Sequence, residues 1–559
     1  MLPIYHERVD DIPLILAMAH QLHLPALLEK HLGSHGNHQG ISNGQLAVVW
    51  LAYILSEGDH RKSTVQEWVD RHQQTLERSC GLTLRPGECN DDRLGIVLRR
   101  FADAARWQAL EAEQWPVSLE AYGWEGDQIH LDSTTTYGYH ARQEGGVMQF
   151  GHSKDHRPDL PQLKLMAAAA LPGQHLVATQ VVPGQMADDP LYLPLYDRVR
   201  QTIGRTGLLY TGDSKMAALA TRATITAHGD YYLLPLPQTG ETPEQMALWI
   251  TQARAAQAAA VAAGTEAIDY ECTREMQWGE QTWQERVHLV LSPTLARKQI
   301  ATYRAHLAQA TQDLLALTPP PGPGHRPIRE EAVLQAAIAK ILRRPEVAAA
   351  VTVTWHREET AVTHYVGRGR GSVHRDQQTE LVVRYHIDAV QRQEAVIADY
   401  EERLGWRVLA TTAPRERLLA TDVVATYGAG WGHEDLFHHL KDRPVGIRPL
   451  WVHLPEQIRG LTHLLLVALR VLMLLEWQVH AALTQGQATL AGLYPEAPRR
   501  TTDHPSARRL LRTFARAQML LVHLPGAPWY VDPLPPLLLQ ILSLLHLDPV
   551  IYTQLAGDT

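Results

Sequence analysis

Two aspartates in this sequence stand where predicted strands end. Asp132 closes the predicted strand 128–132, and Asp213 closes the predicted strand 207–213. In a mixed sheet these two ends can lie side by side, where paired carboxylates repel each other unless a divalent cation bridges them. The pair therefore predicts a metal site, although either aspartate alone could instead cap the structure that follows its strand.

A third acidic residue, Glu434, belongs to a segment with regular spacing. Tyr427, Glu434 and Lys441 are seven residues apart, or two helical turns each, which predicts that they share one helix face. The Glu434 carboxylate would complete the metal cage, and the Lys441 ammonium would hold a phosphate oxygen as a point charge. A solvated helix face with a loose ion pair would have the same spacing.

The elements that must position these residues begin at about residue 125. Three strands are predicted at 128–132, 163–171 and 175–182, and they read as an antiparallel meander. A helix at 191–203, the strand ending at Asp213, a helix at 216–228 and a strand at 231–235 follow. These later strands are joined through helices, as parallel pairing requires.

The 559 residues divide into five predicted segments. A helical module (1–120) precedes the first part of an α/β core (121–237). Residues 238–405 have a different sequence pattern, with an Ala-rich helix and alternating strand candidates, which predicts an insertion. The core resumes at 406–480 with a strand at 406–412, a helix through Glu434 and an apolar helix from Leu461. A helical region (481–559) ends the chain.

Composition limits the function classes. Lys and Arg number 52 against 60 Asp and Glu, a net charge of -8, so any nucleic-acid contact must come from local patches. Three scattered cysteines exclude a disulfide framework and favour a reducing cytoplasm. No secretion signal is apparent at the N-terminus. The most apolar stretches, 461–475 and 537–547, fall short of a membrane span of about 20 residues, which predicts buried core helices and no membrane partner.

Four separated motifs resemble those of a bacterial insertion-sequence transposase of the DDE type. They are, in order, His130-Leu-Asp132-Ser-Thr-Thr, the segment 151–162, Leu209-Tyr-Thr-Gly-Asp213-Ser-Lys-Met-Ala, and the segment from Tyr427 to Lys441. They resemble the branch with a large insertion in its ribonuclease H-like core and a Tyr-x2-Arg-x3-Glu-x6-Lys signature. The stretches 36–42, 56–61 and 91–93 are also similar to the helical module that precedes the core in one subgroup.

The resemblance implies an α/β fold with a ribonuclease H-like mixed sheet and helices on both faces. A mixed α+β insertion domain would interrupt this core, and N- and C-terminal helical regions would flank it. Asp132, Asp213 and Glu434 would be the catalytic residues and would bind Mg²⁺, for which Mn²⁺ can substitute. Tyr427 and Lys441 would contact the transposon ends.

One position departs from the signature, because Gly430 stands where the family has arginine. A missing guanidinium removes a bidentate phosphate contact. Lys154 and Arg157, in the loop after the first strand, are candidate substitutes. Further DNA-facing candidates are Arg443 in the basic stretch 441–470, the arginines at 93–106 and the arginine-rich segment from 499.

The implied activity is metal-dependent cleavage of DNA at insertion-sequence ends and strand transfer into target DNA. The implied partners are double-stranded DNA, as terminal inverted repeats and as target, and a second copy of the chain, because two ends must be held together. The N-terminal module would bind the ends or mediate dimerisation. The protein would be cytoplasmic in a bacterium and nucleoid-associated when bound to DNA.

Two alternatives stay open. A related nuclease of the same fold would cut DNA without joining it. A transposase-derived protein would bind DNA without cutting it, and Gly430 in place of the signature arginine favours this second alternative.

Overall fold

The chain forms two compact units. The computed structural model describes residues 4–34, 39–123, 126–237, 239, 242–262, 270–320, 327–366, 374 and 376–557. Unit 1 comprises Met1–Pro237, Thr273–Arg286 and Ala410–Thr559, and unit 2 comprises Gln238–Cys272 and Val287–Leu409. Every predicted site residue belongs to unit 1.

Unit 1 contains five complete strands, β2 to β6, of a large mixed sheet. Its strand order is β4-β3-β2-β5-β6-β11-β8-β7. The pairs β2–β3 and β3–β4 are antiparallel, whereas β2–β5 and β5–β6 are parallel. This is the predicted meander followed by the predicted helix-joined strands. The strands are β2 Gln128–Tyr137, β3 Gln162–Leu171, β4 His175–Pro183, β5 Leu209–Gly212, β6 Tyr231–Pro235, β7 Tyr270–Trp278, β8 Gln281–Leu291 and β11 Trp406–Thr411.

Helices from both ends of the chain share one core with this sheet. Buried apolar residues from Val9 to Leu555 form a single cluster that includes residues of β3 and β4. The helices of unit 1 are α1 Ile12–Gln21, α2 Leu24–Leu32, α3 Asn43–Glu57, α4 Lys62–Arg71, α5 Gln73–Cys80, α6 Asp91–Phe101, α7 Ala104–Tyr122, η1 Asp189–Leu191, α8 Tyr192–Ile203, α9 Leu219–Ala227, η2 Ala420–Asp422, α15 Val423–Gly428, η3 Ala429–Trp431, α16 Gly432–Lys441, α17 Pro455–Gln485, α18 Ala507–Ala517, α19 Pro536–Leu544, α20 Val550–Thr553 and η4 Gln554–Ala556.

Local sequence fixes where several of these helices begin. Ser42 and Gln45 form a capping box at the start of α3. The side chains of Asn90 and Asp103 cap α6 and α7, and Pro455 occupies the first turn of α17. Because α7 and α17 both pack against β4, these signals also fix the helices that support the sheet.

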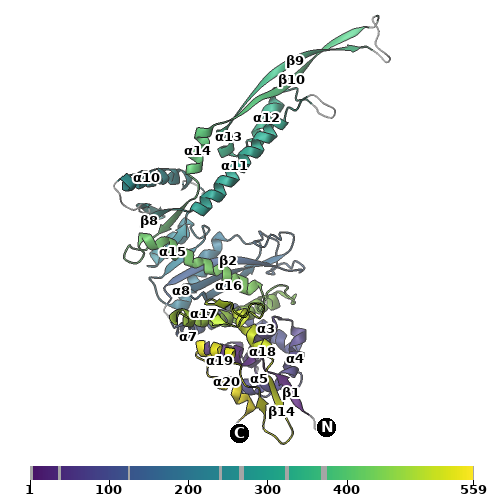
Figure 1. The fold of residues 1–559 in the computed structure, drawn as a ribbon, viewed down its shortest axis with the longest axis vertical. Helices are drawn as coiled ribbons and strands as arrows, with labels where there is room; N and C mark the ends of the chain where they lie inside the picture. Colours follow the sequence, from purple (N-terminus) through teal and green to yellow (C-terminus); the bar gives the residue numbers. More distant parts are fainter. Residues whose placement is uncertain are drawn as a thin grey trace. The chain divides into compact units, whose positions relative to one another are not determined.

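Helices cover both faces of the sheet. On one face, Tyr196 of α8 packs edge-on against Tyr210 of β5, with ring centroids 4.8 Å apart. Thr211 is the next residue along β5, so its side chain points to the opposite face, where it lies 2.9 Å from Nδ1 of His130. On that face His433 of α16 approaches His130, with ring centroids 4.9 Å apart. Figure 1 shows α16 running beside β2.

The strand that carries Asp132 is longer than predicted. β2 continues to Tyr137, so the prediction that Asp132 ends this strand is wrong. The three threonines after Ser133 favour an extended chain because they are β-branched, and they remain paired with β3. Pairing with β5 stops at Leu131 opposite Gly212. Asp132 therefore lies in mid-strand, immediately after the point where the parallel pairing ends.

The long helix α17 is buried. By length and composition alone it could cross a membrane, and so could α1 and α2 if that bent pair were one span. Its 31 residues exceed the predicted stretch 461–475, so the prediction that this segment is too short was wrong. Its most apolar window is 94% buried inside the protein. The segment is a core helix, as predicted.

Short strands accompany the helices of the C-terminal region, which the sequence predicted as helical alone. These strands are β12 Leu490–Ala491, β13 Thr501–Thr502, β14 Leu520–His523 and β15 Tyr530–Val531. β14 pairs with β15 and also, antiparallel, with β1 Tyr5–Arg8 near the start of the chain. The first and the last parts of the described chain therefore meet in one three-stranded sheet.

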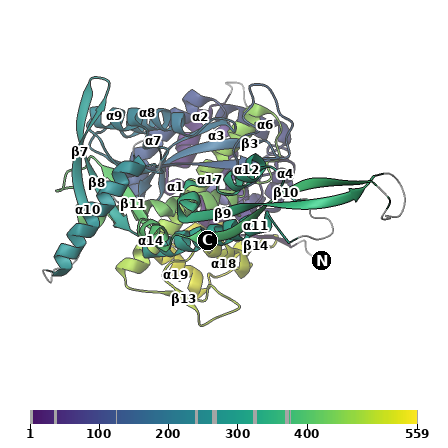
Figure 2. The same ribbon diagram turned by 90° about the horizontal axis from the view of Figure 1, so that it is seen from above.

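Unit 2 is a mixed α+β unit with its own core. Tyr303, Leu307, Leu314 and Leu334 are among the buried residues of this core. β9 and β10 form a long two-stranded ribbon, which exceeds the predicted strands at 351–355 and 381–386 (Figures 1 and 2). The elements are α10 Thr242–Ala262, α11 Pro293–Ala316, α12 Glu331–Ile341, α13 Pro345–Ala350, β9 Val351–Tyr365, β10 Gln377–Arg392 and α14 Glu394–Glu402.

Candidate active site

Asp132 and Asp213 follow directly on the last paired residues of two neighbouring parallel strands. Leu131 of β2 lies opposite Gly212 of β5, so the two aspartates emerge at the same level of the sheet. A Cβ atom on Gly212 would lie 3.0 Å from the carbonyl oxygen of Leu131. Glycine at this position therefore permits the close approach of the two strands beside the carboxylates.

Hydrogen bonds hold both carboxylates in place. The Tyr192 hydroxyl donates to Oδ1 of Asp213 at 2.7 Å, and the Lys215 backbone N–H donates to the same atom at 2.9 Å. The Ser133 backbone N–H donates to Oδ1 of Asp132 at 2.6 Å. Tyr192 comes from the first turn of α8, so the helix before β5 also orients the second aspartate.

The electrostatics of the site favour a cation. Burial raises the pKa of Asp132, and the neighbouring Asp213 raises it further. Lys154 opposes this shift, since its Nζ lies 3.4 Å from Oδ1 of Asp132 while it donates to the carbonyl oxygen of Ser133 at 2.6 Å. The Lys154 ammonium thus occupies a cationic position beside Asp132.

The side chains at this site fit a divalent metal ion in part. Two adjacent carboxylates supply the hard oxygen ligands that Mg²⁺ and Mn²⁺ prefer, and their mutual repulsion is relieved by a bound cation. Two carboxylates alone do not fill such a site. Among the residues that the structure describes, no group of three or more His, Cys, Asp or Glu side chains is placed to hold a metal ion.

A basic network adjoins the two aspartates through the loop after β2. Asp155 of this loop forms ion pairs with Lys441 at 2.8 Å and with Arg448 at 3.3 Å. Arg448 and Arg157 both lie over the ring of Tyr137, at 5.0 and 5.2 Å from its centroid. Lys441 therefore contacts the loop that contains Arg157 and that places Lys154 beside Asp132.

The comparison with protein families decides the class of this chain. The transposase DDE domain family matches residues 124–470, which is more than half of the chain. The chain belongs to this family. Asp132, Asp213 and Glu434 all fall inside the matched segment, which also includes the eight-stranded sheet and about half of α17.

No curated protein matched the chain. Among solved structures, the piggyBac transposase in its synaptic complex with hairpin DNA is similar with 8% sequence identity and a TM-score of 0.26. That similarity covers 51% of this chain and 59% of the other, so this chain spans less than two thirds of the piggyBac structure.

In this DDE domain, Glu434 lies on α16 but does not join the two aspartates. Its side chain is exposed, whereas the preceding His433 is buried against β2. Glu434 and Lys441 lie two turns apart on α16, as predicted, but Tyr427 belongs to a different helix, because the 3-10 turn η3 separates α15 from α16. Gly430 at the centre of η3 is buried. The spacing rule assumed a continuous α-helix that the chain does not form.

Three residues near the aspartates were not predicted. His130 precedes Asp132 by two residues and so lies on the same face of β2. Burial lowers the pKa of His130 to about 4, which keeps the ring neutral. Burial also lowers the pKa of His433, and neither of its ring nitrogens hydrogen-bonds to a described residue. The period-two pattern could have identified His130, but no sequence signal indicates His433 or Tyr192.

Several arginines that were predicted to face DNA are structural instead. Arg470 is buried and donates to Glu111 at 2.9 Å. Glu111 also accepts from Arg198 at 2.6 Å and from Thr179 at 2.8 Å. Glu111 thereby joins α7, α8, α17 and β4. Two of the arginines at 93–106 are structural as well, because the side chains of Arg93 and Arg106 donate to the backbone carbonyls of Ile41 and His31.

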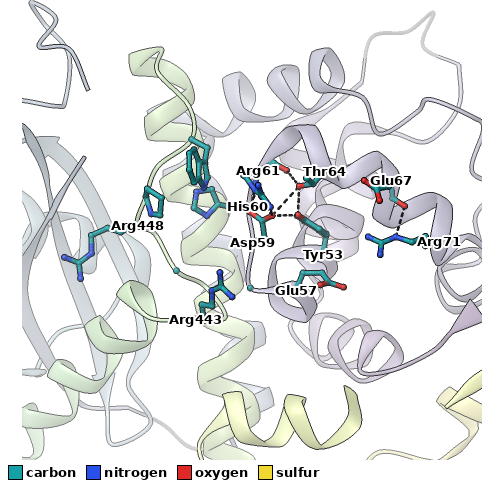
Figure 3. Close-up of a pocket in the computed structure, with 14 residues that line it drawn as sticks. Tyr53, Glu57, Asp59, His60, Arg61, Thr64, Glu67, Arg71, Arg443 and Arg448 are labelled. Atoms are coloured by element: carbon teal, nitrogen blue, oxygen red, sulfur yellow. Dashed lines mark hydrogen bonds and ion pairs between the residues drawn. The ribbon is translucent and has the colours of Figure 1, made fainter. Parts of the chain in front are cut away.

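A cavity of about 480 Å³ lies beside Arg443. Its walls come from the end of α3, the start of α4 and the segment after α16 (Figure 3). On one wall, Asp59 accepts hydrogen bonds from Tyr53 at 2.7 Å and from Arg61 at 2.8 Å. Arg443 forms no ion pair with any described carboxylate, and its guanidinium is therefore available to an anion.

Proposed function

We propose that this protein is a transposase that cleaves DNA at insertion-sequence ends and transfers the strand into target DNA in a metal-dependent reaction. The observation that carries the proposal is the pair of carboxylates, Asp132 and Asp213, held at the end of the β2–β5 parallel pairing inside a transposase DDE domain. Such a pair suits divalent-cation chemistry on phosphate esters.

The chain's own side chains have separate tasks in this proposal. Asp132 and Asp213 would hold Mg²⁺, or Mn²⁺ in its place, and Glu434 would join them through a turn of its exposed side chain or a shift of α16. When bound, the metal polarises the scissile phosphate and favours deprotonation of the attacking hydroxyl. Lys154, next to Asp132, holds a phosphate oxygen of the cleaved strand as a point charge.

The remaining basic residues would bind and orient the DNA. Lys441 and Arg157 adjoin the loop of Lys154, Arg443 faces the cavity of Figure 3, and Tyr427 lies half-buried on α15. The partners are double-stranded DNA, as terminal inverted repeats and target, and a second copy of the chain. The module 1–120 would bind the ends or mediate dimerisation, and the protein would act in the bacterial cytoplasm.

A cleavage assay tests the assignment. Asp132→Asn and Asp213→Asn should each abolish strand cleavage in Mg²⁺ while leaving duplex binding nearly intact. Asp399→Asn in unit 2, an exposed carboxylate paired with Arg403, is the matched control and should cleave normally. Mg²⁺ or Mn²⁺ should also raise the melting temperature of the wild type more than that of either active-site variant. Cleavage that survives both active-site substitutions would reject the proposal.

A second candidate function is DNA binding without cleavage. It is favoured by the exposed side chain of Glu434 and by Gly430 in place of the signature arginine. Titration of Mg²⁺ and Mn²⁺ in a cleavage assay discriminates the two. Binding of transposon-end duplexes with no cleavage at any metal concentration would support the second candidate.

A further inference from the structure

One helix of the C-terminal region carries a row of arginines. Arg508, Arg512 and Arg516 of α18 are spaced by four residues, so they lie above one another along the helix over about 12 Å. Arg512 and Arg516 are exposed and Arg508 is half-buried. These three residues are called the arginine row.

The arginine row forms no ion pair within the part of the chain that the structure describes. Among the described residues, no carboxylate lies within 4.0 Å of the guanidinium of Arg508, Arg512 or Arg516, and none of the three makes a side-chain hydrogen bond. Arg509 of the same helix differs, since it lies 3.6 Å from Glu496 and stacks 4.1 Å over the ring of Tyr494. The lack of partners is therefore a property of one face of α18.

The arginines on this face of α18 repel one another in the free protein. Like charges four residues apart on a helix repel each other, and the nearness of Arg508, followed by Arg516 and Arg509, lowers the pKa of Arg512. Arg443 contributes to the same repulsion from outside the helix. Binding of an external polyanion would relieve the repulsion among these guanidinium groups.

Arg443 connects the row to the end of α16. It lines one hollow together with Arg508 and Arg512, in a wall that also contains Asp11 and Glu57. Arg443 follows Lys441, the last residue of α16, by two positions. The row thus begins beside the C-terminal end of the helix whose first turn carries Glu434.

The chemistry of α18 favours a nucleic-acid backbone over a membrane surface. Its apolar face, formed by Leu510, Leu511 and Phe514, is buried in the core of unit 1, so no apolar side remains to enter a lipid layer. Guanidinium groups bind phosphate bidentately. The length of the row, about 12 Å, equals the width of the DNA major groove, about 12 Å, so its two ends can reach phosphates of both strands.

We propose that the arginine row, together with Arg443, binds the phosphate backbone of double-stranded DNA independently of sequence, outside the strand that is processed at Asp132 and Asp213. The choice of DNA as the partner rests on the proposed function, whereas the row itself contains no catalytic residue. It would hold duplex that flanks the cleavage position.

Salt-dependent binding tests this inference. The full chain is titrated with a fluorescent random-sequence duplex of about 30 base pairs between about 50 and 200 mM KCl. In Arg508→Gln/Arg512→Gln/Arg516→Gln, the slope of log K against log salt should become less negative by about 2.7, or about 0.9 per lost contact. The control Arg304→Gln/Arg357→Gln/Arg403→Gln removes the same charge from exposed, ion-paired sites of unit 2 and should keep the wild-type slope.

An unchanged slope in the row variant overturns the inference. The inference also fails if the same variant loses binding to anionic lipid vesicles while its binding to DNA is unchanged. Because the row repels itself, the variant should melt at the wild-type temperature or above. Arg512→Gln alone, at an exposed position, is a second variant and should reduce the slope by about 0.9.

The inference and the proposed function fail separately. Asp132→Asn should show the wild-type salt slope, because it lies outside the row. If cleavage survives loss of Asp132 and Asp213 while the row variant still changes the slope, the catalytic assignment fails and the row stands. If cleavage needs both aspartates and the row variant keeps the wild-type slope, only the inference about the arginine row is rejected.

Discussion

Gly430 and His130 are in contact in a way that excludes any side chain at position 430. A Cβ atom on Gly430 would lie 2.5 Å from Nδ1 of His130 and 2.7 Å from its Cε1. The buried ring of His130, fixed by Thr211 at 2.9 Å, fills the space into which a side chain at position 430 would extend. The departure from the signature arginine is thus matched by a bulky residue on β2.

This contact predicts the effect of adding one methyl group. Gly430→Ala should lower the free energy of unfolding in urea by about 1 to 3 kcal/mol through overpacking, whereas the same substitution made in a His130→Ala background should cost little, because the ring is no longer there. Gly428→Ala is the control, because its backbone is helical and nothing lies within 4 Å of the new Cβ. It should be neutral or stabilising by up to about 1 kcal/mol. Equal stabilities of the two alanine variants would contradict the contact.

Lys154 should matter for cleavage because of its position beside Asp132. Lys154→Met removes the ammonium 3.4 Å from Oδ1 of Asp132, and we expect the cleavage rate to fall by roughly 10²-fold, as for other charge-stabilising groups. Lys298→Met, an exposed site on α11, should cleave at the wild-type rate. Single-turnover cleavage of a labelled end duplex measures both. A wild-type rate for Lys154→Met would exclude a role at the phosphate.

Asp11 predicts a pH dependence of stability. Burial raises its pKa to about 7, with Asp10 and Glu57 adding to the shift against a hydrogen bond from Ser56. Between its ordinary pKa of 3.8 and about 7 the folded state binds the extra proton, so this group lowers stability as pH rises through that window. Asp11→Asn should therefore be more stable than the wild type at pH 8, by at most about 4 kcal/mol, and the difference should vanish near pH 4. The prediction is refuted if the free energies of unfolding of the two proteins, measured in urea, differ by the same amount at every pH.

The buried Glu111 predicts a large stability loss. Glu111→Gln keeps the shape of the side chain but leaves Arg470 without its buried counter-charge, which should cost about 3 to 5 kcal/mol. Glu113→Gln, two residues further along α7, removes an exposed pair with Lys30 and should change stability little. Urea unfolding of both variants measures the difference. A small effect of Glu111→Gln would mean that Arg470 is compensated elsewhere.

The sequence predicted the sheet well because its rules are local. The strand 231–235 was placed residue for residue as β6, and the helix-joined strands were correctly expected to pair in parallel, which brings Asp132 level with Asp213. Both inferences need only strand composition and connection length.

The failures came from contacts between distant parts of the chain. The seven-residue spacing of Tyr427, Glu434 and Lys441 could not reveal η3, which lies where Gly430 meets His130. Arg470 was counted as a surface charge because its partner, Glu111, is 359 residues away. No pattern within one segment contains that information.

The pairing of β1 with β14 has a consequence for synthesis of the protein. Tyr5 to Arg8 pair with Leu520 to His523, so the partner of the first strand leaves the ribosome only after several hundred further residues. At elongation rates of about 5 to 20 residues per second this delay is on the order of half a minute to two minutes. Throughout that time the edge of β1 stays unpaired on the nascent chain, and polypeptides that stop before β14 never close it. Prematurely terminated copies should therefore be substrates for chaperones and proteases rather than stable competitors of the full-length protein.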